Sequence, residues 1–299
     1  MLTLTEWFAS GDRIKVPFSN RPKTKRSADF HIFCRVAGSG PWLTFLHGFP
    51  TCSWDWAKIT ESLSAKYKLL MFDFLGFGDS DKPGGHAYSI MEQADMTEAL
   101  WRRFEIKDTG LIAHDYGDSV ALELLSRQRE GKLSTRINKV VLLNGGIYVE
   151  KQRPLRIQKL LQKPIIGAVI ANFLTESIFR QRFSSIFSEA HPVSETELRQ
   201  HWQALNRRAG RRRYHRIGRY LKERCQRRVR WEGALENPAS PIRFLWGLAD
   251  PVSGKNVSDE IRKRNPGADL LELENVGHYP QLEVPDVITA EICKAFNVR

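Results

Sequence analysis

Short apolar runs alternate with amphipathic stretches over much of the chain. Six runs rich in branched and aromatic side chains end at glycine or polar residues, as buried strands do: Phe30–Val36, Trp42–Leu46, Leu69–Phe72, Lys139–Leu143, Ile242–Trp246 and Leu270–Leu273. Apolar residues at helical spacing lie at Trp54–Leu63, Ile90–Phe104 and Ile288–Phe296. Strands that alternate with helices predict an α/β fold, in which helices flank a mostly parallel central sheet.

The pattern changes in the middle of the chain and at its start. Between residues 147 and 236 helical stretches replace the strand patterns, so we expect a core at 1–146, an inserted helical cap at 147–236 and the rest of the core at 237–299. The apolar run Ile165–Leu174 either packs the cap onto the core or lines an apolar pocket. Residues 1–27 show no clear period, so no element is predicted there.

A strand pattern passes directly into a helix pattern between Thr109 and Leu125. Asp115 lies at this turn, and the small residues Ala113 and Gly117 stand two positions before and after it. This spacing is that of the nucleophile elbow, a tight strand-to-helix turn that usually carries Ser. Asp at the elbow therefore indicates a carboxylate nucleophile.

Two further candidate residues follow predicted strands. Asp250 comes after Ile242–Trp246, and His278 comes after Leu270–Leu273. Because the carboxyl ends of parallel strands face one crevice, we expect Asp115, Asp250 and His278 to lie close together. Nucleophile, acid and histidine follow one another in this order in the α/β-hydrolase triad.

The net charge of +12 comes almost entirely from one segment. Twelve Lys and Arg residues and a single acid, Glu223, lie between Asn206 and Arg230, which gives +11. Such a block is either a solvated helix face or a surface that attracts an anionic partner. The segment carries no nucleic-acid-binding motif, so we expect no nucleic acid, whereas peripheral contact of 206–230 with an anionic membrane stays open.

The cysteines and the apolar segments indicate a cytoplasmic protein. The four cysteines form no C-x-x-C pair, so we expect free thiols and no metal site. The first residues do not resemble a signal peptide, and no apolar stretch is long enough to span a bilayer.

Five motifs resemble those of the α/β-hydrolase family and occur in its order. They are H-G-F-P at 47–50, D-x-x-G-x-G-x-S at 73–80, H-D-Y-G at 114–117, G-x-x-D-P at 247–251 and G-H-Y-P at 277–280. An Asp nucleophile with H-G-F-P resembles the epoxide hydrolase and haloalkane dehalogenase branch. The elbow sequence is similar to the epoxide-hydrolase-like subgroup of mesoderm-specific transcript proteins. The resemblance implies an α/β-hydrolase fold with a helical cap and no cofactor.

The chemistry of these residues and the resemblance together suggest a role for each. Asp115 would attack an electrophilic carbon and form an alkyl ester. His278, oriented by Asp250, would activate the water that hydrolyses this ester. The backbone N–H groups of Phe49 and Tyr116 would receive the charge that develops on the ester oxygen.

Tyrosines of the insertion are the candidates for a proton donor. Tyr220 resembles the cap tyrosine that protonates the opened epoxide in epoxide hydrolases, although core packing explains it equally well. His47, Tyr148 and Tyr214 are expected to line the substrate site. Neither Tyr148 nor Tyr214 stands where the family pattern has its second tyrosine.

These residues predict an epoxide hydrolase that converts a small apolar epoxide into a diol. The first alternative is haloalkane dehalogenation or another α/β-hydrolase reaction. Dehalogenation is disfavoured because Phe49 and Tyr116 stand where dehalogenases have halide-binding residues. The second alternative is a non-catalytic binding module that uses the basic cap.

Overall fold

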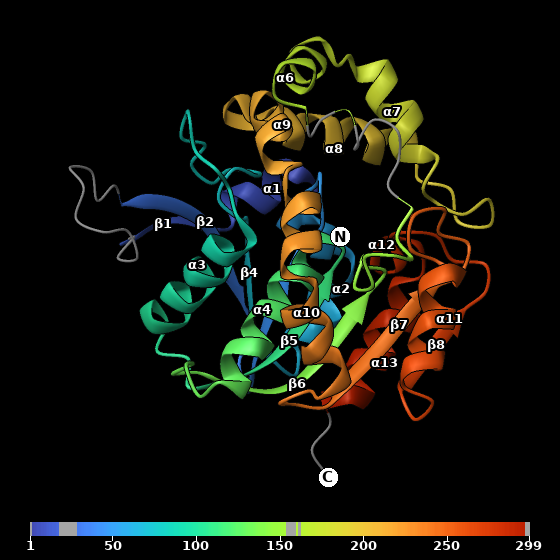
Figure 1. Ribbon diagram of the computed structural model, residues 1–299. Coiled ribbons are helices and arrows are strands. Elements are labelled where there is room, and N and C mark those ends of the chain that lie inside the picture. Colours follow the sequence, from blue (N-terminus) through green and yellow to red (C-terminus); the bar gives the residue numbers. More distant parts are fainter. Residues whose placement is uncertain (1, 18–28, 154–159, 161–162, 297–299) are drawn as a thin grey trace.

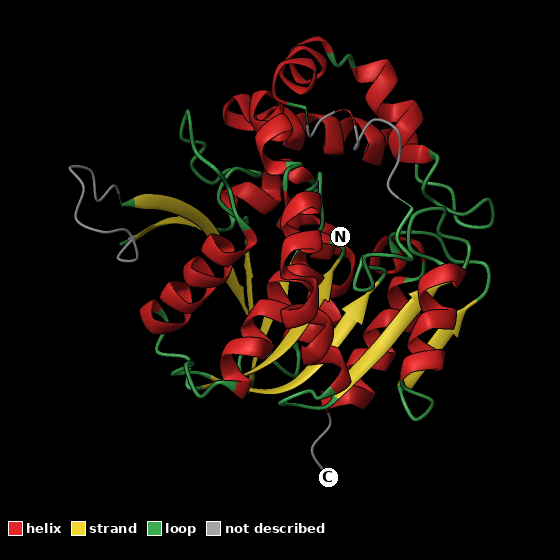
Figure 2. Ribbon diagram, in the orientation of Figure 1, coloured by secondary structure: helices red, strands yellow, loops and turns green. Residues whose placement is uncertain are grey.

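An eight-stranded sheet forms the centre of the computed structural model, which describes residues 2–17, 29–153, 160 and 163–296 (Figures 1 and 2). The strand order is β1-β2-β4-β3-β5-β6-β7-β8. Their bounds are β1 Asp12–Val16, β2 Phe30–Ala37, β3 Trp42–Leu46, β4 Lys68–Phe72, β5 Asp108–His114, β6 Arg136–Leu143, β7 Ile242–Gly247 and β8 Asp269–Leu273. The β1–β2 and β2–β4 pairs are antiparallel and the others are parallel, so the predicted mostly parallel sheet is confirmed.

Helices cover both faces of the sheet, and successive strand residues face opposite layers. On β5, Leu111 and Ala113 join the apolar core that includes residues of α3, α4, α10 and α11, whereas Ile112 joins the core with α1, α2 and α13. The bounds are α1 Leu4–Ala9, α2 Ala57–Ser64, α3 Ile90–Arg103, α4 Tyr116–Arg129, α10 Tyr220–Glu236, α11 Lys255–Arg264 and α13 Pro285–Phe296. The short helices η1 (Ser53–Trp56) and α12 (Pro280–Glu283) complete the core.

The segment 1–27 contains two elements that were not predicted. Helix α1 begins at a capping box, in which the Thr3 side chain accepts from the Glu6 N–H and the Glu6 carboxylate accepts from the Thr3 N–H. Strand β1 pairs with β2 at one edge of the sheet. Because edge strands are partly exposed, β1 lacks the apolar run that marks the inner strands.

Helices from the middle of the chain form a cap over the carboxyl ends of the parallel strands (Figure 1). They are α6 Pro164–Phe173, α7 Glu176–Ser184, α8 Glu195–Asn206, η2 Arg207–Arg213 and α9 Tyr214–Ile217. Helix α10 begins under this cap and then packs along α4 in the core. The last helix of the 147–236 insertion therefore connects the two layers.

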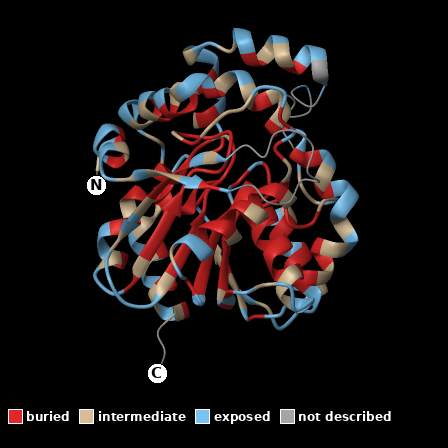
Figure 3. Cartoon of the chain, turned by 90° about the vertical axis from the view of Figure 1, so that its left-hand side faces the viewer, coloured by how far each residue is buried: buried red, intermediate tan, exposed pale blue. Residues whose placement is uncertain are grey.

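Helix α6 packs one of its faces and exposes the other. Its Ala171 is buried, and Ile170 and Leu174 pack against the apolar core, whereas Ile165, Ile166, Val169 and Phe173 are exposed. The expected packing of this apolar run therefore holds for one face of α6 only. Exposed segments dominate the top of the cap in Figure 3. Among the described residues, no helix combines the length and the apolar character needed to cross a bilayer.

Candidate active site

The chain turns sharply at Asp115, between β5 and α4, as the elbow pattern predicts. Asp115 has φ 46° and ψ −100°, a conformation that few residues other than glycine adopt. A Cβ at Gly117 would lie 2.2 Å from the Leu46 carbonyl oxygen, so only glycine lets α4 approach β3 this closely. This sharp turn places the Asp115 side chain at the carboxyl edge of the sheet.

The Asp115 carboxylate is buried and accepts a hydrogen bond from the loop that follows β3. Its Oδ2 accepts from the Phe49 N–H at 3.1 Å, while its own N–H donates to the Leu143 carbonyl at 3.2 Å. Tyr116 begins α4, and N–H groups of a first helical turn have no partner within the helix. The two expected oxyanion-hole residues, Phe49 and Tyr116, therefore both adjoin the carboxylate.

His278 and Asp250 form a buried pair beside the elbow. The Nδ1 of His278 lies 2.7 Å from Oδ2 of Asp250, and the carboxylate also accepts from the Asn144 amide at 3.0 Å and the Ser253 hydroxyl at 2.8 Å. The Val252 N–H donates to its Oδ1 at 2.7 Å. Asp250 is thus fixed as an acceptor, which leaves the other ring nitrogen of His278 for chemistry.

Charge on the neighbouring carboxylates changes the proton affinity of His278. Burial alone lowers the pKa of this imidazole, but the charge of Asp250, the hydrogen bond to it and the charge of Asp115 raise it to about 9. Burial raises the pKa of Asp250, while its interactions with His278, Asn144 and Val252 outweigh burial and lower it. The resting site therefore favours an imidazolium between two carboxylates.

The loop that carries His278 is anchored by residues that the sequence did not single out. The Glu283 carboxylate accepts from the N–H groups of Gly277 and Tyr279 at 2.8 and 3.1 Å. The Nε2 of His114 lies 2.7 Å from the His278 carbonyl oxygen and donates to it. His114 immediately precedes Asp115, and this position in the sequence could have indicated that it lies at the site.

Tyr220 lies over the nucleophile from α10. Its ring centroid is 5.0 Å from that of Tyr116 and 5.7 Å from that of Phe49, and the side chain is buried. Within the described part of the chain, its hydroxyl has no hydrogen-bond partner. Burial and the charge of Asp115 raise the pKa of this phenol. A buried, unpaired hydroxyl beside a carboxylate costs stability, so its place here favours a functional role.

Arg224 is a second α10 residue at the site, and the sequence reasoning missed it. It is 1% exposed, its Nε donates to the Ser119 hydroxyl at 2.6 Å, and its Nη2 donates to the Asp115 backbone carbonyl at 2.8 Å. The same Nη2 lies 3.6 Å from Oδ1 of Asp115. The spacing of four residues from Tyr220 could have indicated that both side chains share one helix face.

His47 and Tyr214, two further residues that were expected to line the substrate site, both form hydrogen bonds with backbone groups. The ring nitrogens of His47 are both occupied, since Nδ1 donates to the Gly48 carbonyl and Nε2 accepts from the Phe74 N–H. Burial lowers the pKa of His47 to about 3. This residue is therefore neutral, and its hydrogen bonds support the loop at residues 47–50. Tyr214 stacks edge-on against Phe49 and donates its hydroxyl to a loop carbonyl, that of Pro50, at 2.8 Å.

Tyr148 is not brought to the nucleophile by any described contact. It is buried, and the Arg264 guanidinium lies 4.6 Å above its ring. Its expected part in substrate binding stays a prediction.

A sequence profile of the alpha/beta hydrolase fold matches residues 41–285, a range that includes Asp115, Asp250 and His278. The chain belongs to the alpha/beta hydrolase fold family. Its elbow, its histidine–carboxylate pair and its helical cap are thus parts of an alpha/beta hydrolase, in which Asp takes the usual place of Ser.

Two relatives and one solved structure show how this alpha/beta hydrolase compares with others. It is 39% identical to the putative hydrolase LipZ of Mycobacterium tuberculosis, over 85% of this chain and 88% of LipZ. It is also 39% identical to the human (Homo sapiens) mesoderm-specific transcript homolog protein, over 84% of this chain and 77% of that protein. The ligand-free epoxide hydrolase CorEH has the same fold, with a TM-score of 0.73 and 18% identity, over 89% of this chain and 95% of CorEH.

Proposed function

We propose that this protein is a hydrolase that opens small apolar epoxides through an alkyl ester on Asp115. The observation that carries the proposal is the pairing of a carboxylate at the elbow with an unpaired, buried tyrosine hydroxyl. Asp115 accepts from the Phe49 N–H, and its charge acts on the Tyr220 phenol above it. A carboxylate and a phenol are what ring opening needs, because one attacks carbon and the other protonates the leaving oxygen.

In the first step, an oxygen of Asp115 forms a bond to an epoxide carbon while that carbon's bond to the ring oxygen breaks. The released alkoxide takes the proton of the Tyr220 hydroxyl. Oδ1 is the attacking oxygen that fits best, since Oδ2 already accepts from the Phe49 N–H. The products are a hydroxyalkyl ester on Asp115 and a phenolate on Tyr220.

Once the ester has formed, the Asp115 charge that favours the imidazolium is gone, and His278 releases its proton to solvent, from which it regains one when the carboxylate returns. In the second step, neutral His278 takes a proton from water and the hydroxide adds to the ester carbon of Asp115. The charge then develops on Oδ2, where the N–H groups of Phe49 and Tyr116 receive it. When the tetrahedral intermediate collapses, the diol oxygen takes the proton from His278. Asp115 returns to its carboxylate form, and the proton that it releases restores the Tyr220 hydroxyl.

Dehalogenation and non-catalytic binding are supported less well. A halide needs donors beside the nucleophile, and the side chains of Phe49 and Tyr116 offer no indole or amide there. A binding module has no need for a buried Asp250–His278 pair next to a strained Asp115. Neither dehalogenation nor non-catalytic binding is therefore favoured by a specific observation among the described residues.

Trapping of the ester tests the proposal. We expect His278→Gln protein, incubated with styrene-type, terpene and fatty epoxides, to gain the mass of one epoxide on the peptide that contains Asp115. His215→Gln, at a half-buried histidine of cap helix α9, is the matched control and should turn over without a stable adduct. Diol formation that persists in Asp115→Ala protein would rule out the covalent route, and halide release from haloalkanes would favour dehalogenation.

A further inference from the structure

Helix α6 presents an uncharged apolar face to solvent. Its ten residues carry no charge, and Ile165 and Phe173 are 81% and 78% exposed. Together with Ile166 and Val169 they lie within an arc of about 100° on the helix. We call these four residues the α6 apolar face. Figure 1 shows α6 at the outer end of the cap, on the side away from the sheet.

Basic residues lie on the two cap helices against which α6 packs. Helix α6 packs on η2 and α9, which belong to the basic segment 206–230. Some of these arginines are occupied: Arg207 pairs with Asp79 at 2.9 Å, and Arg211 donates to the Leu174 carbonyl. Arg212 is exposed and Arg216 half-buried, and neither pairs with an acid within the described residues. Two arginines without an acid partner thus lie on the helices next to α6.

We propose that the α6 apolar face and the neighbouring arginines dock the cap on the surface of an anionic lipid bilayer. An exposed apolar stripe beside Arg residues has the two features with which helices lie in a membrane interface. The apolar side chains enter the acyl boundary, and the guanidinium groups of Arg212 and Arg216 stay at the level of the anionic headgroups.

Charge and side-chain type argue against two other partners for this surface, a second copy of the chain and a nucleic acid. A second copy of the chain would bring its own Arg212 and Arg216 against those of the first, and like charges without acid partners repel. Nucleic acid would satisfy the arginines, but it would leave the aliphatic side chains of Ile165, Ile166 and Val169 in water, since only Phe173 of this face offers a ring for base stacking. An anionic bilayer is the partner that suits both halves of the surface.

One layer of helices separates the docked surface from the candidate active site. Helix α9, on which α6 packs, carries Tyr214, and the Tyr214 ring lies 5.3 Å from that of Phe49. An apolar substrate dissolved in the bilayer would therefore enter close to the site. Docking itself does not require catalysis, so it can be measured in the absence of the proposed activity.

Sedimentation with lipid vesicles tests the docking. We expect the full chain to sediment with vesicles of 70% phosphatidylcholine and 30% phosphatidylserine at low salt, and to dissociate at high salt. Ile165→Ser/Phe173→Ser should weaken binding at least about tenfold, because it removes buried apolar area. Arg212→Gln/Arg216→Gln should weaken it about 25-fold, from about fivefold for each cation.

Matched substitutions separate docking from general effects. Val229→Ser, which removes an 89% exposed side chain on α10, and Lys66→Gln/Lys107→Gln, which removes two exposed cations of the core, should leave binding unchanged. Asp115→Asn should bind like the wild type, so loss of the proposed activity would not count against docking. Failure to sediment with the anionic vesicles at low salt, or equal binding by Ile165→Ser/Phe173→Ser, overturns the proposal. A dimer that dissociates on that substitution also overturns it.

Discussion

At the scale of single residues, the charge on Asp115 acts on both of its proposed partners. It raises the pKa of the His278 imidazole and that of the Tyr220 phenol. Ester formation removes this charge, so both groups become more acidic at that moment. In the proposed reaction, Tyr220 then gives up its proton more readily and His278 reaches the neutral form that a general base needs.

Asp115→Asn should lower the pKa of His278 from about 9 towards its ordinary value of 6.5. The sign follows from electrostatics, since removal of a negative charge destabilises the protonated imidazole. Proton–nitrogen correlation spectra of the imidazole, recorded as a function of pH, measure this shift. Asp259→Asn, on the exposed surface of α11, is the control. An unchanged pKa in Asp115→Asn would mean that Asp250 alone controls His278.

Arg224→Lys should destabilise the protein by about 1–3 kcal/mol, although it keeps the positive charge. One ammonium cannot replace the guanidinium that donates to both Ser119 and the Asp115 carbonyl, so a buried acceptor loses its partner. Urea unfolding measures the loss. Arg227→Lys, which is exposed on the same helix, should behave like the wild type. Equal stability of the two variants would contradict the bridging role of Arg224.

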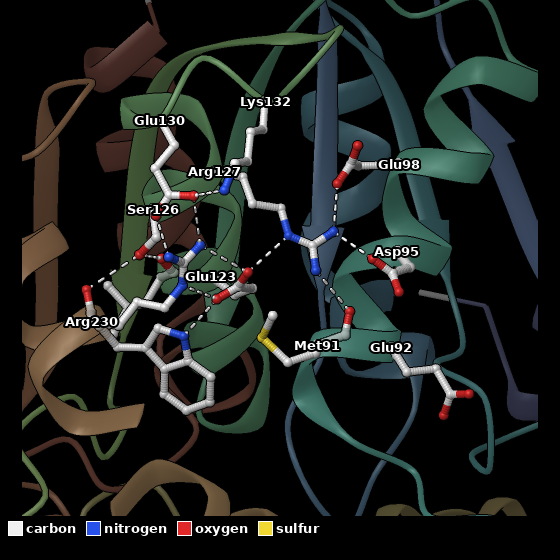
Figure 4. Close-up of polar contacts among 12 residues, drawn as sticks. Met91, Glu92, Asp95, Glu98, Glu123, Ser126, Arg127, Glu130, Lys132 and Arg230 are labelled. Atoms are coloured by element: carbon white, nitrogen blue, oxygen red, sulfur yellow. Dashed lines mark hydrogen bonds and ion pairs between the residues drawn. The ribbon is translucent and has the colours of Figure 1, made fainter. Parts of the chain in front are cut away.

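At the scale of elements, an ion-pair cluster fixes α10 to α4. Figure 4 shows the side chains of Arg127 and Arg230 converging on Glu123. The Nε atoms of both arginines lie 2.8 Å from this carboxylate, and the Trp231 indole donates to it at 2.9 Å. Arg127 also donates to Asp95 and Glu98 of α3. Glu123 thus joins α4 to α10, and Arg127 joins α4 to α3.

Glu123→Gln should lower the free energy of unfolding by about 1–3 kcal/mol, because it removes the buried carboxylate that accepts hydrogen bonds from Arg127, Arg230 and Trp231. Glu130→Gln removes an exposed partner of the same Arg230 and should leave the urea midpoint unchanged. Equal effects of the two substitutions would show that Glu123 is no more important than a surface acid.

The difference between wild type and Glu123→Gln should also depend on pH. Burial raises the pKa of Glu123, but the hydrogen bonds from Arg230, Arg127 and Trp231 outweigh burial and lower it below 4.5. The stabilisation is therefore complete above pH 4.5 and is lost as the pH falls through the lowered pKa. Urea unfolding at a series of pH values checks this, and a difference that grows on acidification would contradict it.

At the scale of the whole molecule, ion pairs join the cap to the core. Arg207 of η2 pairs with Asp79 at 2.9 Å, and Glu197 of α8 pairs with Lys58 of α2 at 2.7 Å. Asp79→Asn/Glu197→Gln should therefore speed amide hydrogen exchange in 195–213 and leave 116–129 unchanged. Mass spectrometry measures both segments. Asp269→Asn, in an exposed pair with Arg243, is the control, and faster exchange in 116–129 would contradict independent docking of the cap.

The sequence predicts the inner strands of this fold and the edge strand β8, but it misses β1 at the other edge. The run Trp42–Leu46 coincides with β3, because a strand buried on both faces must be apolar throughout. Strand β1 escaped notice because an edge strand is partly exposed, and helix α1 has only six residues. The apolar composition of α6 gave no information about what covers it, so its exposure could not be predicted.

The candidate site shows the same contrast. Asp115, Asp250 and His278 follow strands, and the geometry of a parallel sheet alone predicts that they converge. Arg224 is one of twelve basic residues in a single segment, and a count of charges does not show which of them is buried. Its role emerges only when α10 is placed on α4.

Helix α10 carries two residues of the candidate site and is fixed to α4, and this arrangement bears on the engineering of the protein. Tyr220 and Arg224 share α10 with the residues that lock it to α4, the helix that begins at Asp115. Asp115, Tyr220 and Arg224 thus lie on two helices that are fixed to each other, while α6–α9 attach to the core as a separate layer. A cap segment taken from another member of the family and exchanged for residues 163–213 should alter which molecules enter, yet leave the arrangement of the reacting groups intact.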